Sequence, residues 1–365
     1  MAGCVAQLRR ERLFAKSPLI DFVIGPDNYL DLPSLVAGNL GGRRALAERR
    51  DGWHEIGPAE TLRDNPWSAF VPIMEGCDNF CSYCVVPFTR GRVKCRPGTA
   101  VLGEVRHLAR ENCREIQLLG QNVNAYRDPE SGMDFAALLE AVVCEGGIEW
   151  IRFLTSHPRD LVPGMARVMA ANPNICRSIH LPLQSGSTTV LGRMNRGYTR
   201  DDYMGKIDLL RKLMPDISLS TDIIVGFPGE TDADFRETLE AVEAIGFANI
   251  FSFRYSPRPG TAAARGPDDV PDGVKRDRLV ELQEKQKTIQ LGAHRKLVGR
   301  KLKVLCLGRS RKGGLYSGRS EGALVVNFAG PDSAGGREVD GVLGRFVDVL
   351  ITGFGAYSLT GESGG

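Results

Sequence analysis

Short apolar runs alternate with longer stretches of helical periodicity between about residues 67 and 255. The short runs are typical of buried strands, and apolar positions repeated every three or four residues are typical of amphipathic helices. Strands alternating with helices form parallel sheets, so this region predicts an α/β fold with a partial (βα)6 barrel that is open on one side. The predicted strands are 70–74, 115–119, 150–154, 178–183, 217–225 and 249–254, and the predicted helices are 99–111, 134–144, 161–171, 199–213 and 231–245.

The pattern changes after Gly260. A charged helix is predicted over about 273–297, and beyond Gly299 the apolar runs become short, alternating and separated by Gly and Ser. Such runs are typical of a small five-stranded β-barrel that binds nucleic acid on one face. Four of its strands are predicted at 301–308, 315–319, 324–328 and 345–352.

The composition suits a multidomain enzyme. A chain of 365 residues that is 42% hydrophobic can bury a large core, and its length predicts two or three domains. The net charge of +3 excludes no class of partner, but basic residues cluster in Arg90–Arg96 and from Arg295 to Lys312. These clusters indicate either a polyanion-binding strip or solvated faces.

Nine cysteines, an odd number in a chain with no recognisable signal peptide, argue against a disulfide framework and favour a reducing compartment. No apolar stretch approaches the roughly 18 residues that a spanning helix needs. We therefore expect a soluble, cytoplasmic protein.

Cys77, Cys81 and Cys84 follow the first predicted strand with the spacing C-x₃-C-x₂-C. Such a loop can direct three thiolates to one [4Fe–4S] cluster, which leaves the fourth iron open for a small-molecule ligand. The alternative is a structural zinc site with Cys95 as the fourth ligand. Zinc sites usually pair their cysteines at two separate places, so the spacing favours the cluster.

Four other predicted strands also end in polar or small residues. Each segment alone could be an ordinary turn. Together with the cysteine loop they predict a ligand site at the carboxyl end of the sheet. The segments are 120–122, 155–158, 184–187 and 226–230.

Longer motifs then carry a family resemblance over nearly the whole chain. They resemble the radical S-adenosylmethionine (SAM) methylthiotransferases, in particular the bacterial branch that modifies tRNA rather than a ribosomal protein. The motifs are 69–92 around the three cysteines, 118–124 (LLGQNVN), 155–158 (TSHP), 180–187 (HLPLQSGS), 194–199 (MNRGYT), 222–231 (DIIVGFPGET), and 325–328 and 344–349 near the C-terminus.

The resemblance implies a radical SAM core at 63–296, an OB-like TRAM domain at 299–364 and, at 1–50, a remnant of an N-terminal α/β domain. It also implies methylthiolation at C2 of an N6-prenylated adenosine next to the anticodon. In that reaction SAM is cleaved reductively, and the 5′-deoxyadenosyl radical abstracts hydrogen from C2.

Site residues follow from the same resemblance. Cys77, Cys81 and Cys84 are expected to hold the SAM cluster. Cys4 matches the last of three cysteines that bind an auxiliary [4Fe–4S] cluster in the family; the other two have no counterpart, so we expect an N-terminally truncated chain in which full sulfur insertion is doubtful. The expected SAM contacts are Tyr83, Val225 and Gly226 for adenine, Gly120 and Gln121 for the amino and carboxylate groups, and Ser156, Gln184 and Ser185 for the ribose or methionine portion.

His157 and His180 are predicted to be structural. The expected partners are tRNA and an electron donor such as flavodoxin or ferredoxin, with no membrane and a monomeric chain; the sulfur donor stays open. Two alternative functions remain at this point: an RNA-binding, SAM-cleaving fragment that cannot insert sulfur, and a methylthiotransferase of a ribosomal protein.

Overall fold

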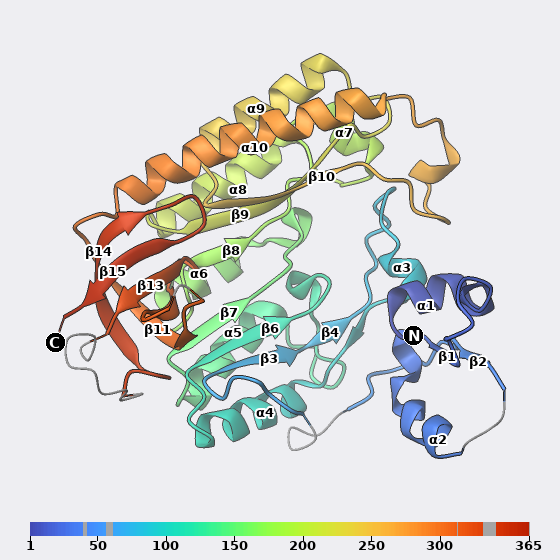
Figure 1. The fold of residues 1–365 in the computed structure, drawn as a ribbon, viewed down its shortest axis with the longest axis horizontal. Coiled ribbons are helices and arrows are strands. Elements are labelled where there is room, and N and C mark those ends of the chain that lie inside the picture. The colour runs from blue at the N-terminus through green and yellow to red at the C-terminus, as the bar shows by residue number, and fades with distance from the viewer. Residues whose placement is uncertain (39–41, 56–60, 312, 331–340, 365) are drawn as a thin grey trace.

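The computed structural model describes residues 1–38, 42–55, 61–311, 313–330 and 341–364. It contains a small N-terminal unit, a half-barrel with helices on its outer face, and a small closed β-barrel at the C-terminus (Figure 1).

Six parallel strands form the half-barrel. One sheet contains β3 (Ser68–Pro72), β6 (Glu115–Leu119) and β7 (Trp150–Phe153), and the other contains β8 (Ser178–His180), β9 (Ser218–Val225) and β10 (Asn249–Arg254). A bridge between Ile151 and Ile175 and a hydrogen bond from Ser156 N to His180 O connect the two sheets. The strand order is therefore β3-β6-β7-β8-β9-β10, and within the described residues β3 and β10 each pair with one half-barrel strand only. The predicted partial barrel is confirmed.

Helices cover the outer face of these strands (Figure 1). Thr199 and Thr231 begin α8 and α9 with capping boxes, in which the threonine hydroxyl and an aspartate side chain each accept a backbone N–H. The helices are α4 (Gly98–Arg110), α5 (Phe135–Glu145), α6 (Pro163–Ala171), α8 (Arg200–Leu213), α9 (Asp232–Ile245) and α10 (Asp272–Arg295), with the shorter α3 (Val86–Thr89) and α7 (Thr188–Arg193) near the carboxyl rim.

The interior of the half-barrel, which we call the lumen, is lined by polar and apolar side chains together. Along β9 the outward residues Leu219, Thr221, Ile223 and Val225 are buried against the helices, whereas the alternate residues Ser218, Ser220, Asp222 and Ile224 stay partly accessible. This alternation follows from the period of two in a strand. A closed barrel of eight strands fills its interior with packed apolar layers, but the lumen of this half-barrel leaves room for a ligand.

The C-terminal barrel consists of β11 (Lys301–Arg309), β12 (Tyr316–Ser320), β13 (Val325–Ala329), β14 (Phe346–Phe354) and β15 (Leu359–Ser363). The strands close in the order β11-β12-β13-β15-β14 around a core that includes Val304, Val326, Phe328 and Leu359. The predicted five-stranded barrel is confirmed. It packs against the amino ends of the half-barrel strands, where Trp150 meets Phe346 edge to face.

The N-terminal unit contains α1 (Cys4–Arg9), β1 (Phe22–Ile24), α2 (Leu32–Ala37) and β2 (Arg44–Leu46), with β1 and β2 paired in parallel. Helix α1 contacts α3, which directly follows the cysteine loop (Figure 1). Within the described residues we find no helix whose length and apolar character would suit a lipid bilayer.

The structure shortens two predicted strands. The first ends at Pro72, after which Met74–Glu75 (β4) pairs with Lys94–Cys95 (β5) outside the barrel sheet. The fourth ends at His180, two residues before Pro182, because proline has no N–H for a ladder bond.

The basic cluster Arg90–Arg96 is largely not an open polyanion surface. Lys94, whose side chain is 11% exposed, pairs with Asp27 and Glu75, and Arg96, at 3%, pairs with Glu55 and Glu104. Asp27 and Glu55 come from segments far away in the sequence, whereas Glu104 is eight residues from Arg96. The interpretation of this cluster as a polyanion-binding strip is therefore wrong for these two residues.

Candidate functional site

A cavity of about 260 Å³ lies at the carboxyl rim of the half-barrel, beside the cysteine loop. It brings together most of the residues that the sequence predicts for the site. Those present in its lining are Cys77, Cys81, Tyr83, Cys84, Gly120, Gln121, Ser156 and Gln184, accompanied by Asn79, Val86, Asn122, Thr155, His157, Pro182, Arg196 and Asp222.

Each of the three sulfur atoms accepts one N–H. The donor to Cys77 is the backbone of Asn79 at 3.4 Å, and the donor to Cys84 is the backbone of Val86 at 3.5 Å. Cys81 accepts from the guanidinium of Arg196 at 3.3 Å. Hydrogen bonds of this kind stabilise thiolates and tune the potential of a bound cluster.

The loop that carries the cysteines is fixed from both sides. Gly76 has a φ of 76°, and a Cβ at this position would lie 2.0 Å from the carbonyl oxygen of Arg92. The Gly76 N–H donates to Oε1 of Gln121 at 2.7 Å. Gln121 therefore connects the end of β6 to the start of the cysteine loop.

Burial disfavours ionisation of the thiols. It raises the pKa of Cys77 and raises the pKa of Cys84 to about 11. Metal ligation requires the thiolate, and the positive charge of bound iron reverses the effect of burial. The described residues contain no group of three His, Cys, Asp or Glu side chains placed to hold a single metal ion. The geometry thus gives no support to a single zinc ion, whereas thiolates of a four-iron cluster bind separate irons.

Cys95 lies apart from this cavity lining. Its sulfur accepts the backbone N–H of Arg127 at 3.4 Å, and burial raises its pKa. It behaves as a packed thiol beside the β4 and β5 pair.

Three polar atoms in the cavity lining are buried without a hydrogen-bond partner: Ser156 Oγ, His157 Nε2 and Gln184 Oε1. An unsatisfied buried polar atom costs about 1–3 kcal/mol, and here three of them come from two different loops. A polar molecule bound beside the cysteines would satisfy them. The lining therefore fits a cluster with an attached hydrogen-bonding ligand such as SAM.

The side chain of His157 is a neutral imidazole that can donate a hydrogen bond. Its Nδ1 accepts the Arg159 N–H at 3.2 Å, so the ring proton resides on Nε2. Burial, with a further contribution from the charge of Arg196, lowers the pKa of His157 to about 3. The sequence placed His157 among structural residues, and the structure adds that its free N–H lies in the cavity wall.

Two lining residues adopt the left-handed region that is uncommon outside glycine. The φ of Thr155 is 66° and that of Gln184 is 72°. Gln184 is nevertheless held firmly, since its N–H donates to Asp222 O and its carbonyl accepts from Ile224 N. Such strain concentrates at functional sites, and here it directs the Gln184 side chain away from the β9 ladder.

The other predicted SAM contacts lie outside this lining. Ser185 Oγ contacts Thr238 Oγ1 at 3.3 Å and accepts the Ser187 N–H, so it attaches the turn to α9. Val225 is fully buried toward the helices. The Gly226 N–H donates to Glu230. Cys4, which was predicted as a ligand of an auxiliary cluster and not as a SAM contact, is the first residue of α1.

Gly120 and Tyr83 line the cavity and also have packing roles of their own. A Cβ on Gly120 would lie 2.4 Å from Met74 Cγ, so packing against Met74 already requires glycine there. Tyr83 accepts a hydrogen bond from Arg196 at 3.4 Å and meets Phe227 edge to face, so part of its ring packs within the protein.

Sequence reasoning missed Arg196, although it lies inside the MNRGYT motif. Its guanidinium is buried and donates to Cys81, Tyr83, Tyr198 and Pro182 O. A buried cation that contacts a cluster thiol bears directly on the charge of the site. The available signal was a single basic residue inside a motif that also contains the core residues Met194 and Tyr198.

The chain is similar to known proteins over most of its length. The Radical SAM superfamily matches residues 71–242. The tRNA-2-methylthio-N(6)-dimethylallyladenosine synthase of Solibacter usitatus is 44% identical over 99% of this chain and 81% of its own length, and that of Chlorobium limicola is 47% identical over 100% and 80%. Coproporphyrinogen III oxidase of Escherichia coli, a radical SAM enzyme of known structure, is 16% identical with a TM-score of 0.47, covering 70% of this chain and 67% of its own. Identity of this extent to the synthases shows that the chain belongs to the radical SAM family of tRNA-2-methylthio-N(6)-dimethylallyladenosine synthases.

Proposed function

We propose that this chain adds a methylthio group to C2 of an N6-prenylated adenosine in tRNA, using SAM and a [4Fe–4S] cluster. One observation carries the proposal: three thiols, those of Cys77 and Cys81 buried and that of Cys84 half-buried, share a cavity with three buried polar atoms that have no hydrogen-bond partner among the described residues. The substrate follows from the activity of tRNA-modifying relatives that are 44% and 47% identical to this chain.

Cys77, Cys81 and Cys84 would hold the cluster. When bound, such a cluster supplies the electron for reductive cleavage of SAM. Arg196 donates to Cys81, and its charge would offset part of the negative charge of three thiolates. Gln121 keeps the cysteine loop on the end of β6 through the Gly76 N–H.

The orphaned polar atoms would orient SAM. His157 Nε2–H can donate to a carboxylate, and Gln184 Oε1 can accept from an amino or hydroxyl group. Ser156 Oγ can do either. Because these groups sit on loops that are hydrogen-bonded to β8 and β9, they would hold SAM without large rearrangement.

The remaining residues that were predicted as SAM contacts would act on the SAM site indirectly. Ser185 and Gly226 shape the rim through the contacts with Thr238 and Glu230, and Val225 supports it from the core. Tyr83 and Gly120 would border the adenine and amino ends of SAM. Cys4 as a ligand of an auxiliary cluster stays a prediction.

We retain three further proposals from the sequence. The domains are 1–50, 63–296 and 299–364, the electron donor is a flavodoxin or ferredoxin, and the chain is a monomer in the cytoplasm. The division fits the three parts of the fold, because the linker between the half-barrel and the C-terminal barrel follows α10.

The test is an anaerobic reaction of the reconstituted chain with reductant, SAM, a sulfide source and tRNA that carries N6-prenyladenosine. We expect digested tRNA to contain a nucleoside heavier by one methylthio group, and iron analysis to give about four or eight irons for one or two cubes. Cleavage of SAM without the heavier nucleoside would favour the RNA-binding fragment. Gain of the same mass by a ribosomal protein would favour the third alternative.

A further inference from the structure

Two half-exposed phenylalanines stand on β10, the edge strand of the half-barrel. Phe251 is 51% exposed and Phe253 is 52% exposed. They are two residues apart, so they point to the same side of the strand. Their partners on β9 are Asp222 and Ile224, which face the lumen, so the phenylalanines face the lumen as well.

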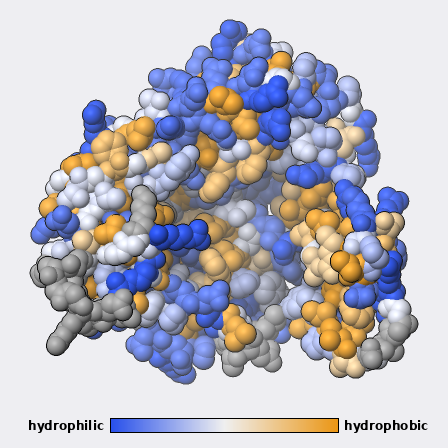
Figure 2. All heavy atoms as spheres, in the orientation of Figure 1, coloured by the Kyte–Doolittle hydropathy of each residue, from blue (hydrophilic) through white to orange (hydrophobic). Residues whose placement is uncertain are grey.

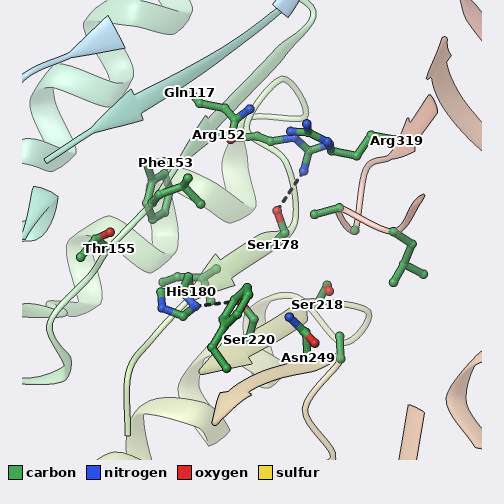
Figure 3. Close-up of a pocket in the computed structure, with 17 residues that line it drawn as sticks. Gln117, Arg152, Phe153, Thr155, Ser178, His180, Ser218, Ser220, Asn249 and Arg319 are labelled. Atoms are coloured by element: carbon green, nitrogen blue, oxygen red, sulfur yellow. Dashed lines mark hydrogen bonds between the residues drawn. The ribbon is translucent and has the colours of Figure 1, made fainter. Parts of the chain in front are cut away.

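Phe251 borders the larger cavity of the lumen, which has a volume of about 420 Å³. Figure 3 shows Asn249, Ser220 and His180 on one side of this cavity and Arg152 and Arg319 at another. The imidazole of His180 meets Phe251 edge to face at 5.7 Å between centroids. This contact fixes one edge of the ring and leaves half of the side chain accessible.

Phe253 borders a neighbouring cavity of about 260 Å³. Tyr83 and Gln184 line this cavity and also line the cysteine cavity. The two phenylalanines therefore extend from the lumen cavity to the proposed SAM site. Figure 2 shows hydrophobic side chains gathered in the central hollow of the molecule, framed by more hydrophilic surfaces.

Two arginines accompany the aromatic pair. Arg254 and Arg258 line the same cavity as Phe253, and both are exposed. Arg254 pairs with Val225, so its side chain leaves β10 on the side opposite to the two rings, whereas Arg258 lies beyond the carboxyl end of the strand. Among the described residues neither guanidinium has an ion-pair or hydrogen-bond partner. Lys94 and Arg96, in contrast, are both paired with carboxylates. The combination of open aromatic rings with available cations is typical of sites for single-stranded nucleic acid.

We propose that an unpaired nucleobase of the RNA substrate stacks on Phe251 and Phe253 as it enters the lumen, with its backbone phosphates passing the rim of the half-barrel near Arg258. The proposal rests on the proposed function for the identity of the substrate class. Side chains two residues apart on a strand are about 7 Å apart. Bases stack at about 3.4 Å, so this spacing has room for one base between two rings.

The competing occupant of an exposed apolar surface is another protein surface, such as a second copy of the chain. Stacking on a base depends on the planar ring of the side chain and on the presence of the base, whereas protein docking depends on neither RNA nor planarity. The charge of Arg254 and Arg258 favours the polyanion. Binding measurements with and without the base, together with the oligomeric state of the chain, distinguish the two occupants.

The test is a double-mutant cycle between protein and RNA. Binding of a stem-loop with an unpaired prenyladenosine is compared with binding of the same stem-loop carrying an abasic nucleotide at that position. The proteins are the reconstituted full chain, the double variant Phe251→Leu/Phe253→Leu, the variant Phe253→Trp, and the control Val280→Ala, which alters a residue 47% exposed on α10.

We expect the double leucine variant to bind the adenosine RNA about tenfold more weakly and the abasic RNA less than about twofold more weakly, in line with the strength of base stacking on aromatic rings. Phe253→Trp and Val280→Ala should keep the wild-type preference. Equal losses on both RNAs, or no loss on either, would overturn the proposal. A change in the oligomeric state of the leucine variant without RNA, with unchanged RNA binding, would assign the surface to a second copy.

The two proposals fail separately. If the wild-type chain methylthiolates the RNA and the leucine variant does so equally well at limiting RNA, the stacking proposal is wrong and the proposed function stands. If base-dependent binding requires the phenylalanines but no methylthio product forms, the stacking proposal stands and the proposed function is wrong.

Discussion

Arg152 donates from Nε to Oε2 of Glu115 at 2.5 Å, and both side chains are less than 5% exposed. The same guanidinium donates to the backbone carbonyls of Ser320 at 2.7 Å and Glu321 at 2.6 Å. One arginine therefore connects β6 and β7 of the half-barrel to the turn between β12 and β13 of the C-terminal barrel. Figure 3 shows this end of the lumen, with Arg319 beside Arg152.

Arg152→Leu should destabilise the chain and loosen the C-terminal barrel. The substitution leaves Glu115 with Arg319 and Ser68 as its remaining partners, in a site where the carboxylate is fully buried. Removing one partner of a buried ion pair costs about 3–5 kcal/mol when the remaining charge is uncompensated. Because Arg319 still pairs with Glu115, we expect a loss near or below the lower end of this range. Denaturant unfolding followed by fluorescence should show this loss, with an earlier transition for the C-terminal barrel.

Arg114→Leu is the matched control for that experiment. Arg114 pairs with Glu149 at 2.6 Å on the surface, with side chains 38% and 37% exposed. Surface pairs contribute less than about 1 kcal/mol. Equal losses in the two variants would show that the Arg152 pair does not anchor the C-terminal barrel.

Replacing any one of Cys77, Cys81 and Cys84 by alanine should remove the visible absorbance of a reconstituted cluster and abolish SAM cleavage. Two thiolates rarely retain a four-iron cube. Cys95→Ser should change neither quantity, because its sulfur only accepts the Arg127 N–H. Cluster loss in the serine variant would replace the three-thiolate site by a four-cysteine site.

His157 should make the fold acid-sensitive. Its pKa is lowered to about 3 by burial and by Arg196, against an ordinary value of about 6.5. The unfolded chain binds the proton first, so the contribution of the neutral imidazole is complete above about pH 6.5 and is lost progressively as the pH falls toward 3.

At about pH 5 the difference between the pKa of His157 in the folded and the unfolded chain lowers the free energy of unfolding by roughly 2 kcal/mol. His157→Gln removes the titrating group, so its free energy of unfolding should fall less than that of the wild type between about pH 7.5 and pH 5. Urea unfolding of both proteins at the two pH values measures this. Parallel losses in the two proteins would mean that His157 is not the group responsible.

Basic residues of the C-terminal barrel should govern the salt dependence of RNA binding. Arg309 and Arg311 are exposed at the end of β11, and Lys312, the third residue of the predicted group, lies outside the described residues. Each lost phosphate contact flattens the plot of log affinity against log salt by about 0.7–0.9. Replacing both arginines by glutamine should therefore lower the slope by roughly 1.5.

The control for this prediction is the double variant Arg236→Gln/Arg276→Gln, which alters exposed arginines on α9 and α10. It should leave the slope unchanged. Fluorescence anisotropy of labelled RNA over a salt series gives both slopes. A slope that stays at the wild-type value in the Arg309 and Arg311 variant would remove this segment from the RNA surface.

The parts of the fold that depend on local pattern were predictable. The bounds of β6 and β10 agree with the predicted 115–119 and 249–254, because a short run rich in apolar residues between turn residues specifies a strand by itself, whether it is buried as in β6 or at the edge as in β10. The cysteine loop was found because its chemistry is contained in eight consecutive positions, 77–84.

Features set by the tertiary structure were not predictable from the pattern. Gln184 and Ser185 are adjacent and equally polar, yet the left-handed backbone at Gln184 places one beside the cavity and the other against Thr238. Lys94 and Arg96 resemble a binding strip, but Asp27 and Glu55, which are distant in the sequence, pair with them in the fold. The aromatic pair on β10 was likewise invisible as a surface, because exposure depends on which strand forms the edge.

The serines at 156 and 185 offer a crossed test of the site. Ser156 Oγ is buried in the cavity lining without a partner, so Ser156→Ala removes an unsatisfied group and should leave the free energy of unfolding unchanged or slightly higher. The same substitution should weaken SAM binding about two- to tenfold, which corresponds to one hydrogen bond. Ser185→Ala breaks the contacts with Thr238 and the Ser187 N–H, so it should cost about 1–3 kcal/mol of stability and change the SAM affinity by less than about twofold. Urea unfolding and equilibrium binding of SAM to the reconstituted chain measure the two quantities. If Ser185→Ala instead weakened SAM binding while Ser156→Ala lowered stability, the two serines would have exchanged roles, and Ser156 would no longer be assigned to the SAM site.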